Sequence, residues 1–404
     1  MKILYVLPYC PVPPTFGGAL RVYHLLRQMT RVHQVSVIVY GVKSDEDILR
    51  NAYPSLERIT IVPPPHSWKG IRKRLSQLLS IISLRSGAYY YFYSKEMQHA
   101  IDSALAKNDF DLIQTEAHIM GWFVLRSGAF KILDTQNVEY DTFRRMSATT
   151  SSPLRKIYYW LEATKCRREE IAICSKQDAV FVTSVRDKII LDADIPDIPK
   201  FVIPNGVDTS YFHSRSKSED PLALVFTGSM NYPPNSDGAI FFIDKILPRI
   251  RSQFPGIRLY VVGNAPPRAL RRRNSASVVI TGYVEDVRPY IERASVYVVP
   301  LLSGGGTRLK VLEALAMRKG IVTTTIGCEG IDLNHHESLM IANDPEEFAD
   351  AVIHLLRNTP LRQRLANAGN KLVRLRYDWD VIGETLNSVY ASLLSGVNTR
   401  RARM

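Results

Sequence analysis

Short apolar runs alternate with helical patterns along the first half of the chain. Residues 3–7 form one such run, residues 19–31 follow a helical pattern, and residues 34–40 form a second run. A strand, a helix and a strand in this order predict a βαβ unit with parallel strands. Runs of the same kind predict further buried strands at residues 58–62, 112–114, 131–134, 179–183 and 200–203. The first half is therefore expected to form a parallel sheet covered by helices.

The second half repeats this alternation after a polar stretch at residues 214–220. Its predicted strands lie at residues 222–227, 258–262, 278–281, 296–299 and 321–324. A turn at Pro204, Asn205 and Gly206 separates the halves, because Asn-Gly is a strong breaker pair. We expect an α/β protein with two Rossmann-like domains, residues 1–205 and 206–378, that face each other across a cleft. Residues 379–404 are expected to form a helix that packs back on the first domain, followed by a basic tail.

The composition is that of a folded protein, with 46% hydrophobic and 23% charged residues. A chain of 404 residues exceeds the size of roughly 250 to 300 residues at which single cores stop growing. No run approaches the roughly 18 to 20 apolar residues that span a bilayer, and the start of the chain fits a strand better than a signal peptide. We therefore expect a cytoplasmic protein. The four cysteines show neither a disulfide framework nor zinc spacing, so reduced thiols and no metal site are expected.

The net charge of +13 is concentrated in part between Arg58 and Lys95, where there are seven Lys or Arg residues and no acid. Apolar and basic residues interleave there, so this segment could lie on the anionic inner face of the cell membrane. An ordinary packed helix with a solvated basic face explains the pattern equally well. The run of aromatic residues at 89–93 could likewise contact lipid or pack. No nucleic-acid motif accompanies the charge.

The run from Gly304 to Lys310 follows a predicted strand, and a helical pattern is expected to begin near Thr307. Three consecutive glycines let the backbone approach a ligand, and a helix start presents free N–H groups and a positive dipole end. Arg308 and Lys310 add charge that suits a diphosphate, whose negative charge grows as a sugar leaves. Glu313, further along the same helix, could accept two ribose hydroxyls. The alternative without a ligand is a glycine-rich loop with a solvated helix start.

Several short motifs lie along the chain, before and after this loop, at characteristic spacings. They lie at residues 17–18, 133–139, 178–184, 202–208, 226–230, 259–263, 281–284 and 312–316. With the Gly-Gly-Gly-Thr-Arg-Leu-Lys loop, they resemble the retaining GT-B glycosyltransferases of family 4, in a branch that acts in surface-polysaccharide assembly. The resemblance covers nearly the whole chain.

This resemblance implies that the second domain binds a nucleoside-diphosphate sugar and that the first binds the acceptor. It implies transfer of a hexosyl group with retained anomeric configuration, without a metal or cofactor. Glu313 would hold the ribose, Tyr283 and Val284 would border the base, and Gly17 and Gly18 would approach the sugar or phosphates. The other donor-binding positions that the motifs imply are Gly228, Ser229, Gly305, Gly306, Thr307, Arg308 and Lys310.

The chain departs from the family pattern at three positions. Gly305 stands where the family has the first of two glutamates, so Glu329 is a candidate to replace that carboxylate, although a turn residue is equally consistent. The family's basic pair after Gly228 is absent, which leaves Arg308 and Lys310 to meet the phosphate charge. Gln136 stands where the family has a histidine after about the fourth strand. We assign catalytic roles to Arg308, Lys310 and Gln136.

Two other features have a structural and a functional interpretation. His118 could border the acceptor or simply pack. The helical stripe of Tyr158, Tyr159, Leu161 and Ile171 is interpreted as core rather than as an acceptor groove.

The sequence thus predicts a glycosyltransferase with a saccharide or lipid-linked acceptor, acting as a monomer or weak dimer without nucleic acid. A catalytically silent binding or assembly subunit is the second hypothesis, and a nucleotide-sugar 2-epimerase is the third. A dehydrogenase is disfavoured because neither half has a spaced G-x-G-x-x-G after its first strand.

Overall fold

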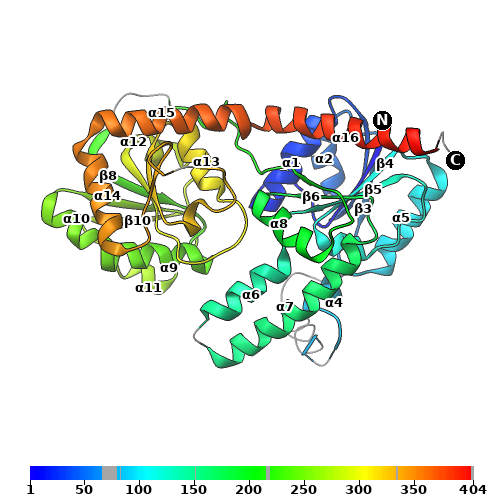
Figure 1. Cartoon of the computed structure of the whole chain (residues 1–404), viewed down its shortest axis with the longest axis horizontal. Coiled ribbons are helices and arrows are strands. Elements are labelled where there is room, and N and C mark those ends of the chain that lie inside the picture. The colour runs from blue at the N-terminus through cyan, green and yellow to red at the C-terminus, as the bar shows by residue number, and fades with distance from the viewer. Residues whose placement is uncertain (66–79, 82, 151, 215–218, 334, 402–404) are drawn as a thin grey trace. The chain divides into compact units, whose positions relative to one another are not determined.

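The computed structural model describes residues 1–65, 80–81, 83–150, 152–214, 219–333 and 335–401. It consists of two compact units, Met1–Pro204 together with Ile382–Met404, and Asn205–Val381 (Figure 1). The division after Pro204 lies one residue before the predicted domain boundary. Each unit has its own parallel sheet and its own apolar core.

The first unit contains a sheet of seven parallel strands in the order β3-β2-β1-β4-β5-β6-β7. The strands are β1 (Lys2–Leu7), β2 (Gln34–Tyr40), β3 (Arg58–Val62), β4 (Leu112–Glu116), β5 (Phe130–Thr135), β6 (Ala179–Val182) and β7 (Lys200–Val202). The helices are α1 (Gly17–Met29), α2 (Asp45–Ala52), α4 (Gly87–Phe92), α5 (Lys95–Lys107), the 3-10 helix η1 (His118–Trp122), α6 (Glu139–Thr149), α7 (Pro153–Cys174) and α8 (Val185–Asp194).

Central strands of this sheet are buried on both faces, which explains why they read as continuous apolar runs rather than as alternating ones. The strand order reverses between β1 and β4. In open α/β sheets such a switch point, at the carboxyl ends of the strands, is where ligands bind. Loops that follow β1, β4 and β5 are therefore the places to look for a site in this unit.

The last helix, α16 (Trp379–Arg401), begins in the second unit and continues through the first. Its Tyr390 is fully buried and shares a 2.8 Å hydrogen bond with the hydroxyl of Tyr5 on β1. The Tyr390 hydroxyl also donates to Gln114 on β4, and Asn387 bonds the ring of His33 at 2.8 Å. These contacts fix the C-terminal helix onto the first unit.

The second unit contains a six-stranded parallel sheet in the order β10-β9-β8-β11-β12-β13. The strands are β8 (Asp220–Thr227), β9 (Arg258–Val262), β10 (Val278–Gly282), β11 (Ala294–Val299), β12 (Gly320–Thr323) and β13 (Met340–Ile341). The helices are α9 (Pro233–Phe241), the π-helix η2 (Phe242–Ile246), α10 (Leu247–Gln253), α11 (Arg268–Arg271), α12 (Arg288–Arg293), α13 (Leu309–Ala316), the 3-10 helix η3 (Ile326–Cys328), α14 (Pro345–Arg357) and α15 (Thr359–Arg376). The predicted α/β class with two Rossmann-like sheets is confirmed, and the switch point of this sheet lies between β8 and β11.

The basic segment between Arg58 and Lys95 is described only in part. Its amphipathic stretch at residues 68–79 and 82 lies outside the described residues. The aromatic run is packed: Tyr89 stacks on Tyr93 with centroids 5.0 Å apart, and Tyr93 stacks on Phe123 at 5.4 Å. Within the described parts of the chain, no helix is both long and apolar enough to cross a membrane.

Candidate active site

Four loops converge at the carboxyl edge of the second sheet, after β8, β9, β11 and β12. The loops after β8 and β9 touch, since a Cβ on Gly263 would lie only 1.7 Å from the carbonyl oxygen of Gly228. The loop after β12 touches the glycine-rich loop after β11, since a Cβ on Gly330 would lie 3.3 Å from the Cα of Thr307. This convergence surrounds the switch point between β8 and β11, where a ligand site is expected.

Gly228 ends β8 in a conformation with a φ of 153°. A Cβ at this position would lie 2.6 Å from Nζ of Lys310 and 2.9 Å from Nδ2 of Asn235. The absent side chain therefore leaves the space that the ammonium group of Lys310 uses. Sequence analysis placed Gly228 and Lys310 in one site, and the structure brings them into contact.

Lys310 lies in the first turn of α13 and is partly buried. Its Nζ donates a 2.6 Å hydrogen bond to Oδ1 of Asn235 on α9 and lies 4.5 Å from the ring centroid of Phe226 on β8. Nδ2 of Asn235 in turn donates to the carbonyl of Ser229 at 2.8 Å. Burial, together with the neighbouring charge of Arg308, lowers the pKa of Lys310 to about 7. Because burial and Arg308 disfavour the charged form of Lys310, an anion bound beside it would stabilise the ammonium strongly.

Arg308 is the residue before α13, and only 6% of its surface is exposed. Its Nε donates to the carbonyl of Ile326 at 3.1 Å, and one terminal nitrogen donates to the carbonyl of Gly305 at 2.5 Å. The guanidinium thus ties the glycine-rich loop to η3. The hydroxyl of Thr307 is buried and has no hydrogen-bond partner within the described residues. Arg308 and Thr307 therefore present positive charge and a donor where the two loops meet.

The predicted helix start near Thr307 is wrong by two residues. Helix α13 begins at Leu309, because Arg308 has a φ of −85° and a ψ of 81°, which is not helical. The two carbonyls that hold the Arg308 side chain explain why this residue remains outside the helix. Lys310, rather than Arg308, consequently lies in the first helical turn.

Glu313 follows Lys310 by three residues on α13, so both side chains lie on neighbouring positions of one helix face. Burial raises the pKa of the Glu313 carboxyl to about 7, and the charge of Lys310 opposes this rise. A carboxyl group in such a place is suited to accept hydroxyl groups of a polar ligand.

The remaining predicted positions of the second unit lie on the same four loops or on the loop after β10. The Ser229 hydroxyl lies 2.5 Å from Oδ1 of Asn264 and 2.6 Å from Oδ1 of Asn231, so it can donate to either, and these contacts join the loops after β8 and β9. Tyr283 follows β10 and is exposed, whereas Val284 packs partly against the core. Glu329 follows η3 and is partly buried beside Gly330, whose backbone contacts Thr307.

The predicted residues of the first unit also lie near its switch point. Gly18 is the second residue of α1, and a Cβ there would lie 2.3 Å from Oε1 of Gln136 and 2.4 Å from the hydroxyl of Tyr9. The Tyr9 hydroxyl donates to Oε1 of Gln136 at 3.0 Å. Gly17 precedes this contact and is exposed. Gln136 follows β5, the strand predicted at residues 131–134.

A buried polar cluster lies beneath these residues. Arg21 on α1 holds Asp134 on β5 with a 2.9 Å ion pair, and both side chains are essentially fully buried. Glu116 ends β4, accepts from Nε2 of Gln114 at 2.7 Å, and has a second carboxyl oxygen with no hydrogen-bond partner in the described part of the chain. Burial, and then the charge of Asp134, raises the pKa of Glu116 to about 8.

His118 begins η1 and is buried, with its ring 5.8 Å from that of Trp122 in an edge-on contact. Burial lowers its pKa to about 4, so the ring is neutral at neutral pH. Its Nε2 has no hydrogen-bond partner among the described residues. Ala117 before it has a φ of 62° and a ψ of 149°, a conformation normally restricted to glycine and often found at functional sites.

The stripe on α7 is not simply core, as the sequence interpretation had it. Its four residues, Tyr158, Tyr159, Leu161 and Ile171, are all only partly buried. Ile171 packs against a core cluster, but it also lines a surface groove together with Leu161. The interpretation as core therefore holds only in part.

Sequence analysis missed Asn235, Phe226 and Glu116 as members of these two clusters. Asn235 lies in the first turn of α9, and its hydrogen bonds with Lys310 and with the carbonyl of Ser229 link it to the site. The signal that could have identified Glu116 is a carboxylate at the end of a fully buried strand, which is itself unusual. Within the described residues, no group of three or more His, Cys, Asp or Glu side chains is arranged to hold a metal ion.

Comparison with known proteins agrees with this architecture. Residues 221–358 match the family described as Glycosyl transferases group 1. Over 394 residues the chain is 24% identical to a 44.6 kDa protein in the cps region of Klebsiella pneumoniae, covering 93% of this chain and 96% of that protein. It is 29% identical over 206 residues to the phosphatidyl-myo-inositol mannosyltransferase of Mycobacterium tuberculosis, covering 47% of this chain and 53% of the mannosyltransferase. The chain thus matches about half the length of that enzyme.

Solved structures show the same fold. Sucrose-phosphate synthase from Thermosynechococcus elongatus superposes with a TM-score of 0.70 at 16% identity, covering 98% of this chain and all of that one. HepE of Anabaena, solved in complex with UDP, superposes with a TM-score of 0.69 at 12% identity, covering 97% of this chain and all of that one. The sheet order of each unit and these superpositions show that the chain has the GT-B fold. Residues 221–358 therefore match the group 1 glycosyl transferases, and the chain as a whole has the fold of these solved structures.

Proposed function

We propose that this glycosyltransferase moves a hexosyl group from a nucleoside-diphosphate sugar to a saccharide or lipid-linked acceptor, with retained anomeric configuration and without a metal. The observation that carries the donor assignment is the contact of Lys310 with the Gly228 loop, beside a buried Arg308. Two cations and a free hydroxyl meet at the carboxyl edge of the sheet, where α/β folds bind phosphates. This arrangement supports a diphosphate between the loops after β8 and β11.

The cations would also assist the chemistry. As the bond between the sugar and the diphosphate breaks, negative charge accumulates on the leaving group. Lys310 and Arg308 are oriented by Asn235, Gly305 and Ile326 before any substrate arrives. Because their orientation needs no rearrangement during the reaction, they can stabilise the leaving diphosphate at little further cost. This use of fixed charge requires no metal ion.

Residues on the other loops would contact the remaining parts of the donor. Glu313, three residues after Lys310, would accept the ribose hydroxyls, and exposed Tyr283, directly after β10, would border the base. Glu329 is the carboxylate that we assign to the sugar hydroxyls, since Gly305 supplies none. In the first unit, Gly17, Gly18 and Gln136 would approach the sugar.

The names of two relatives support the acceptor class. One is a protein of the cps region of Klebsiella pneumoniae, and the other is a mannosyltransferase named for a phosphatidyl-inositol acceptor. A membrane-bound or polysaccharide acceptor for this chain fits both. The family 4 assignment and the surface-polysaccharide branch are part of the same proposal.

The donor can be identified without knowing the acceptor. A thermal-shift screen of UDP-, GDP- and dTDP-sugars should show stabilisation by one class of donor, by about 2.7 kcal/mol at a concentration a hundred times the dissociation constant. The Arg308→Ala and Lys310→Ala variants should lose that stabilisation at the same concentration. Arg364→Ala, on an exposed part of α15, is the matched control and should keep it. No stabilisation by any nucleoside-diphosphate sugar would contradict the donor assignment.

Turnover distinguishes an enzyme from a silent binding subunit. The absence of a carboxylate at Gly305 is the observation that favours a silent subunit. An active transferase should hydrolyse or transfer its donor, and Arg308→Ala or Lys310→Ala should slow this by about a hundredfold to a thousandfold, the loss of one transition-state donor. Donor binding without any hydrolysis or transfer, across an acceptor panel of lipid-linked saccharides, would support the silent subunit.

A further inference from the structure

The outer face of α7 exposes three large apolar side chains. Leu154 is 82% exposed, Ile157 is 58% exposed and Trp160 is 61% exposed. They recur at intervals of three residues, so they lie along one stripe of the helix. We call these three residues the α7 patch. Soluble surfaces tolerate single exposed apolar residues, but a contiguous stripe of this kind marks a binding surface.

Positive charge surrounds the α7 patch. Between residues 142 and 168 there are seven Lys or Arg residues and one acid, of which Arg144 and Arg145 pair with Asp141 and Arg167 pairs with Asp194. Arg155 and Lys156 lie beside the patch and are exposed, as are Arg167 and Arg168 further along α7. The surface therefore combines apolar side chains with a basic border.

The acids of α7 point inward and are occupied. Glu162 accepts from the backbone N–H of Gly87 at 2.8 Å, and Glu169 accepts from the hydroxyl of Ser86 at 2.6 Å. Glu170 accepts from the backbone N–H of Tyr140 at 3.0 Å. All three carboxylates are buried, so they stabilise the starts of α4 and α6 and leave the outer face of α7 without exposed acids.

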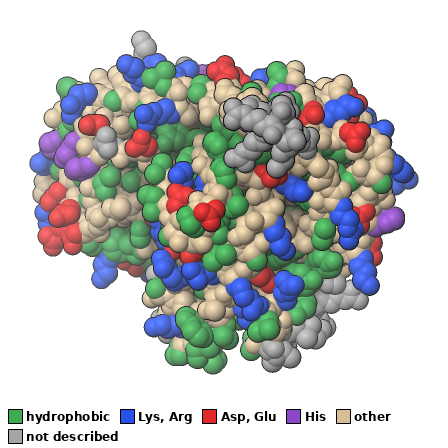
Figure 2. Space-filling model, turned by 45° about the vertical axis from the view of Figure 1, so that its right-hand side comes forward, with side chains coloured by type: hydrophobic (Ala, Val, Ile, Leu, Met, Phe, Trp, Pro, Cys, Tyr) green, Lys and Arg blue, Asp and Glu red, His purple; other side chains and the backbone are tan. Residues whose placement is uncertain are grey.

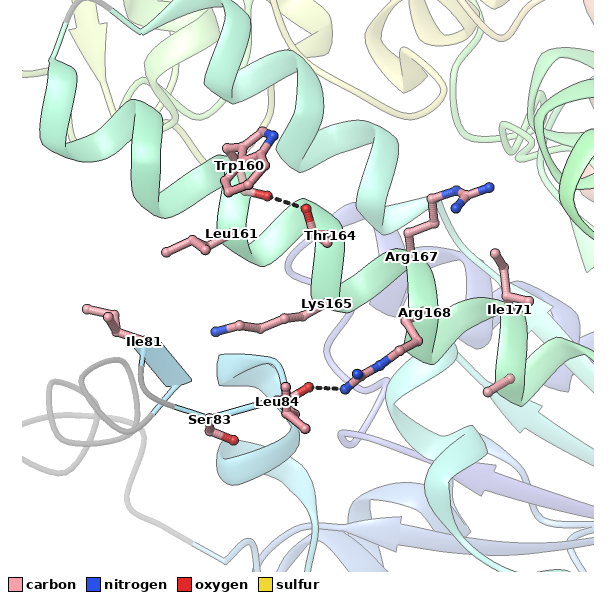
Figure 3. Close-up of a pocket in the computed structure, with 11 residues that line it drawn as sticks. Ile81, Ser83, Leu84, Trp160, Leu161, Thr164, Lys165, Arg167, Arg168 and Ile171 are labelled. Atoms are coloured by element: carbon pink, nitrogen blue, oxygen red, sulfur yellow. Dashed lines mark hydrogen bonds between the residues drawn. The ribbon is translucent and has the colours of Figure 1, made fainter.

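A groove extends the same surface along the helix. Figure 3 shows Leu161 and Ile171 of α7 on one side and Ile81 and Leu84 on the other, with the Lys165 side chain between them. The groove has a volume of about 780 Å³. Arg168 reaches across it and donates to the carbonyl of Leu84. The groove thus combines aliphatic walls with cationic groups, as the α7 patch and its basic border do.

The position of α7 leaves this surface open. In Figure 1, α6 and α7 form an antiparallel pair that extends away from the strands of their own unit. Figure 2 shows hydrophobic side chains gathered beside Lys and Arg side chains at the lower end of the molecule, where Figure 1 draws these helices. Within its own unit, the α7 patch therefore lies on a pair of helices that stands clear of the sheet.

We propose that the α7 patch and its basic border dock the protein on an anionic lipid bilayer. Leu154, Ile157 and Trp160 would enter the interface between headgroups and acyl chains, where tryptophan is favoured. Arg155 and Lys156 would meet the anionic headgroups. This docking surface goes beyond the proposed sugar transfer and does not depend on it, because no residue of the donor site takes part.

Charge complementarity favours a membrane over a second copy of this chain. A symmetric dimer through the α7 patch would bring two basic borders against each other, and like charges across an interface oppose association. An anionic bilayer presents the opposite charge and an apolar interior together. It thus satisfies both features of the surface.

The test is flotation of the full chain with vesicles. We expect the protein to float with vesicles of phosphatidylcholine and phosphatidylglycerol and to stay at the bottom with vesicles of phosphatidylcholine alone. The triple variant Leu154→Ser, Ile157→Ser, Trp160→Ser should bind the anionic vesicles at least about tenfold more weakly, because three apolar side chains no longer enter the interface. The double variant Arg155→Glu, Lys156→Glu should weaken binding to a similar degree.

Matched substitutions elsewhere serve as controls. Leu375 on α15 is 62% exposed, so Leu375→Ser removes a comparable apolar side chain far from α7 in the sequence. Arg364→Glu with Lys371→Glu reverses two exposed charges on the same helix. Both controls should float like the unmodified chain. Vesicles with brominated acyl chains should quench the fluorescence of Trp160, and this part of the quenching should disappear in Trp160→Phe.

Three results would overturn the proposal. The first is no flotation with anionic vesicles, and the second is equal flotation of the triple variant and the unmodified chain. The third is a dimer, seen by light scattering, that the triple variant abolishes while vesicles bind neither protein. Thermal stabilisation by the donor, measured in the same triple variant, should be unchanged, so loss of membrane binding and loss of donor binding are recorded separately.

Discussion

Lys310 is a cation whose proton is held weakly until an anion arrives. Burial and the charge of Arg308 lower its pKa to about 7. A bound diphosphate would raise that pKa, so binding at pH 8 should take up as much as about one proton, whereas binding at pH 6 should take up almost none. Calorimetry in two buffers with different ionisation enthalpies measures this uptake. Binding at pH 8 that is independent of the buffer, or uptake that persists in Lys310→Met, would contradict this role.

Glu116 provides a second test at the residue scale, on stability rather than binding. Its folded-state pKa of about 8 lies above the ordinary value of 4.5, so the folded state holds the proton more tightly than the unfolded state. Stability from this group is full below pH 4.5 and is lost as the pH rises towards 8, by up to about 1.4 kcal/mol per pH unit. Between pH 5.5 and pH 8, the free energy of unfolding of Glu116→Gln should therefore fall less than that of the unmodified chain. Urea unfolding at several pH values measures this difference. Parallel stability profiles for the two proteins would show that Glu116 is ionised in the folded state.

Some of the site could be predicted residue by residue, and some could not. A glycine at a strand end and two cations at a helix start predict one phosphate site with Gly228, Arg308 and Lys310. The structure brings Gly228 and Lys310 together. Asn235 could not be predicted, because its role depends on a contact with Lys310 across 75 positions of sequence. The same holds for the Tyr390 contact with Gln114, which spans 276 positions.

At the scale of elements, the loop after β8 depends on the absence of a side chain. Gly228→Ala would place a methyl group 2.6 Å from Nζ of Lys310, so the ammonium must move away from the loop. We expect the affinity for the nucleoside diphosphate to fall by about tenfold or more, which corresponds to at least about 1.4 kcal/mol. Isothermal titration measures this loss.

Gly282 is the matched control for this substitution. It also has a positive φ, of 73°, but a Cβ there would have no neighbour within 4 Å. Gly282→Ala should cost about 1 kcal/mol of stability through backbone strain and leave the nucleoside-diphosphate affinity within about twofold. Equal losses of affinity in the two variants would attribute the effect to strain rather than to Lys310.

Helix α16 should stabilise the first unit through its buried tyrosine. The Tyr390 hydroxyl bonds both Tyr5 and Gln114, so Tyr390→Phe leaves buried partners unsatisfied and should cost about 1 to 3 kcal/mol. Tyr232→Phe, at a residue that is largely exposed, should change stability by less than about 0.5 kcal/mol. Urea unfolding compares the two, and equal stabilities would contradict a packed α16.

Strands were easier to predict than the ends of helices. Strands β1, β2, β3 and β9 agree with the predicted runs to within a residue. For β1 and β2 the reason is that a parallel strand buried on both faces is continuously apolar. The start of α13 was predicted two residues too early, because hydrogen bonds from the Arg308 side chain to two carbonyls keep that residue out of the helix. Such contacts between side chain and backbone leave no periodic signal in the sequence.

At the scale of the whole molecule, two units of the same architecture divide the residues of the proposed reaction. The second unit holds Arg308, Lys310 and Glu313, and the first holds Gly17, Gly18 and Gln136. Repeated alternation of strands and helices was sufficient to predict both sheets, since each βαβ unit is local in sequence. The cleft between the domains stays a prediction, which the Asn205-Gly206 turn alone supports.

The central claim is that Arg308 and Lys310 receive the diphosphate of an activated sugar. The most direct measurement is a crystal structure of the chain with the nucleoside diphosphate that gives the largest thermal shift. The account predicts phosphate oxygens within hydrogen-bond distance of Nζ of Lys310 and of the guanidinium of Arg308, beside Gly228 and Gly306. A nucleoside diphosphate bound elsewhere, with Lys310 still bonded to Asn235 and Arg308 still bonded to Gly305 and Ile326, would contradict it.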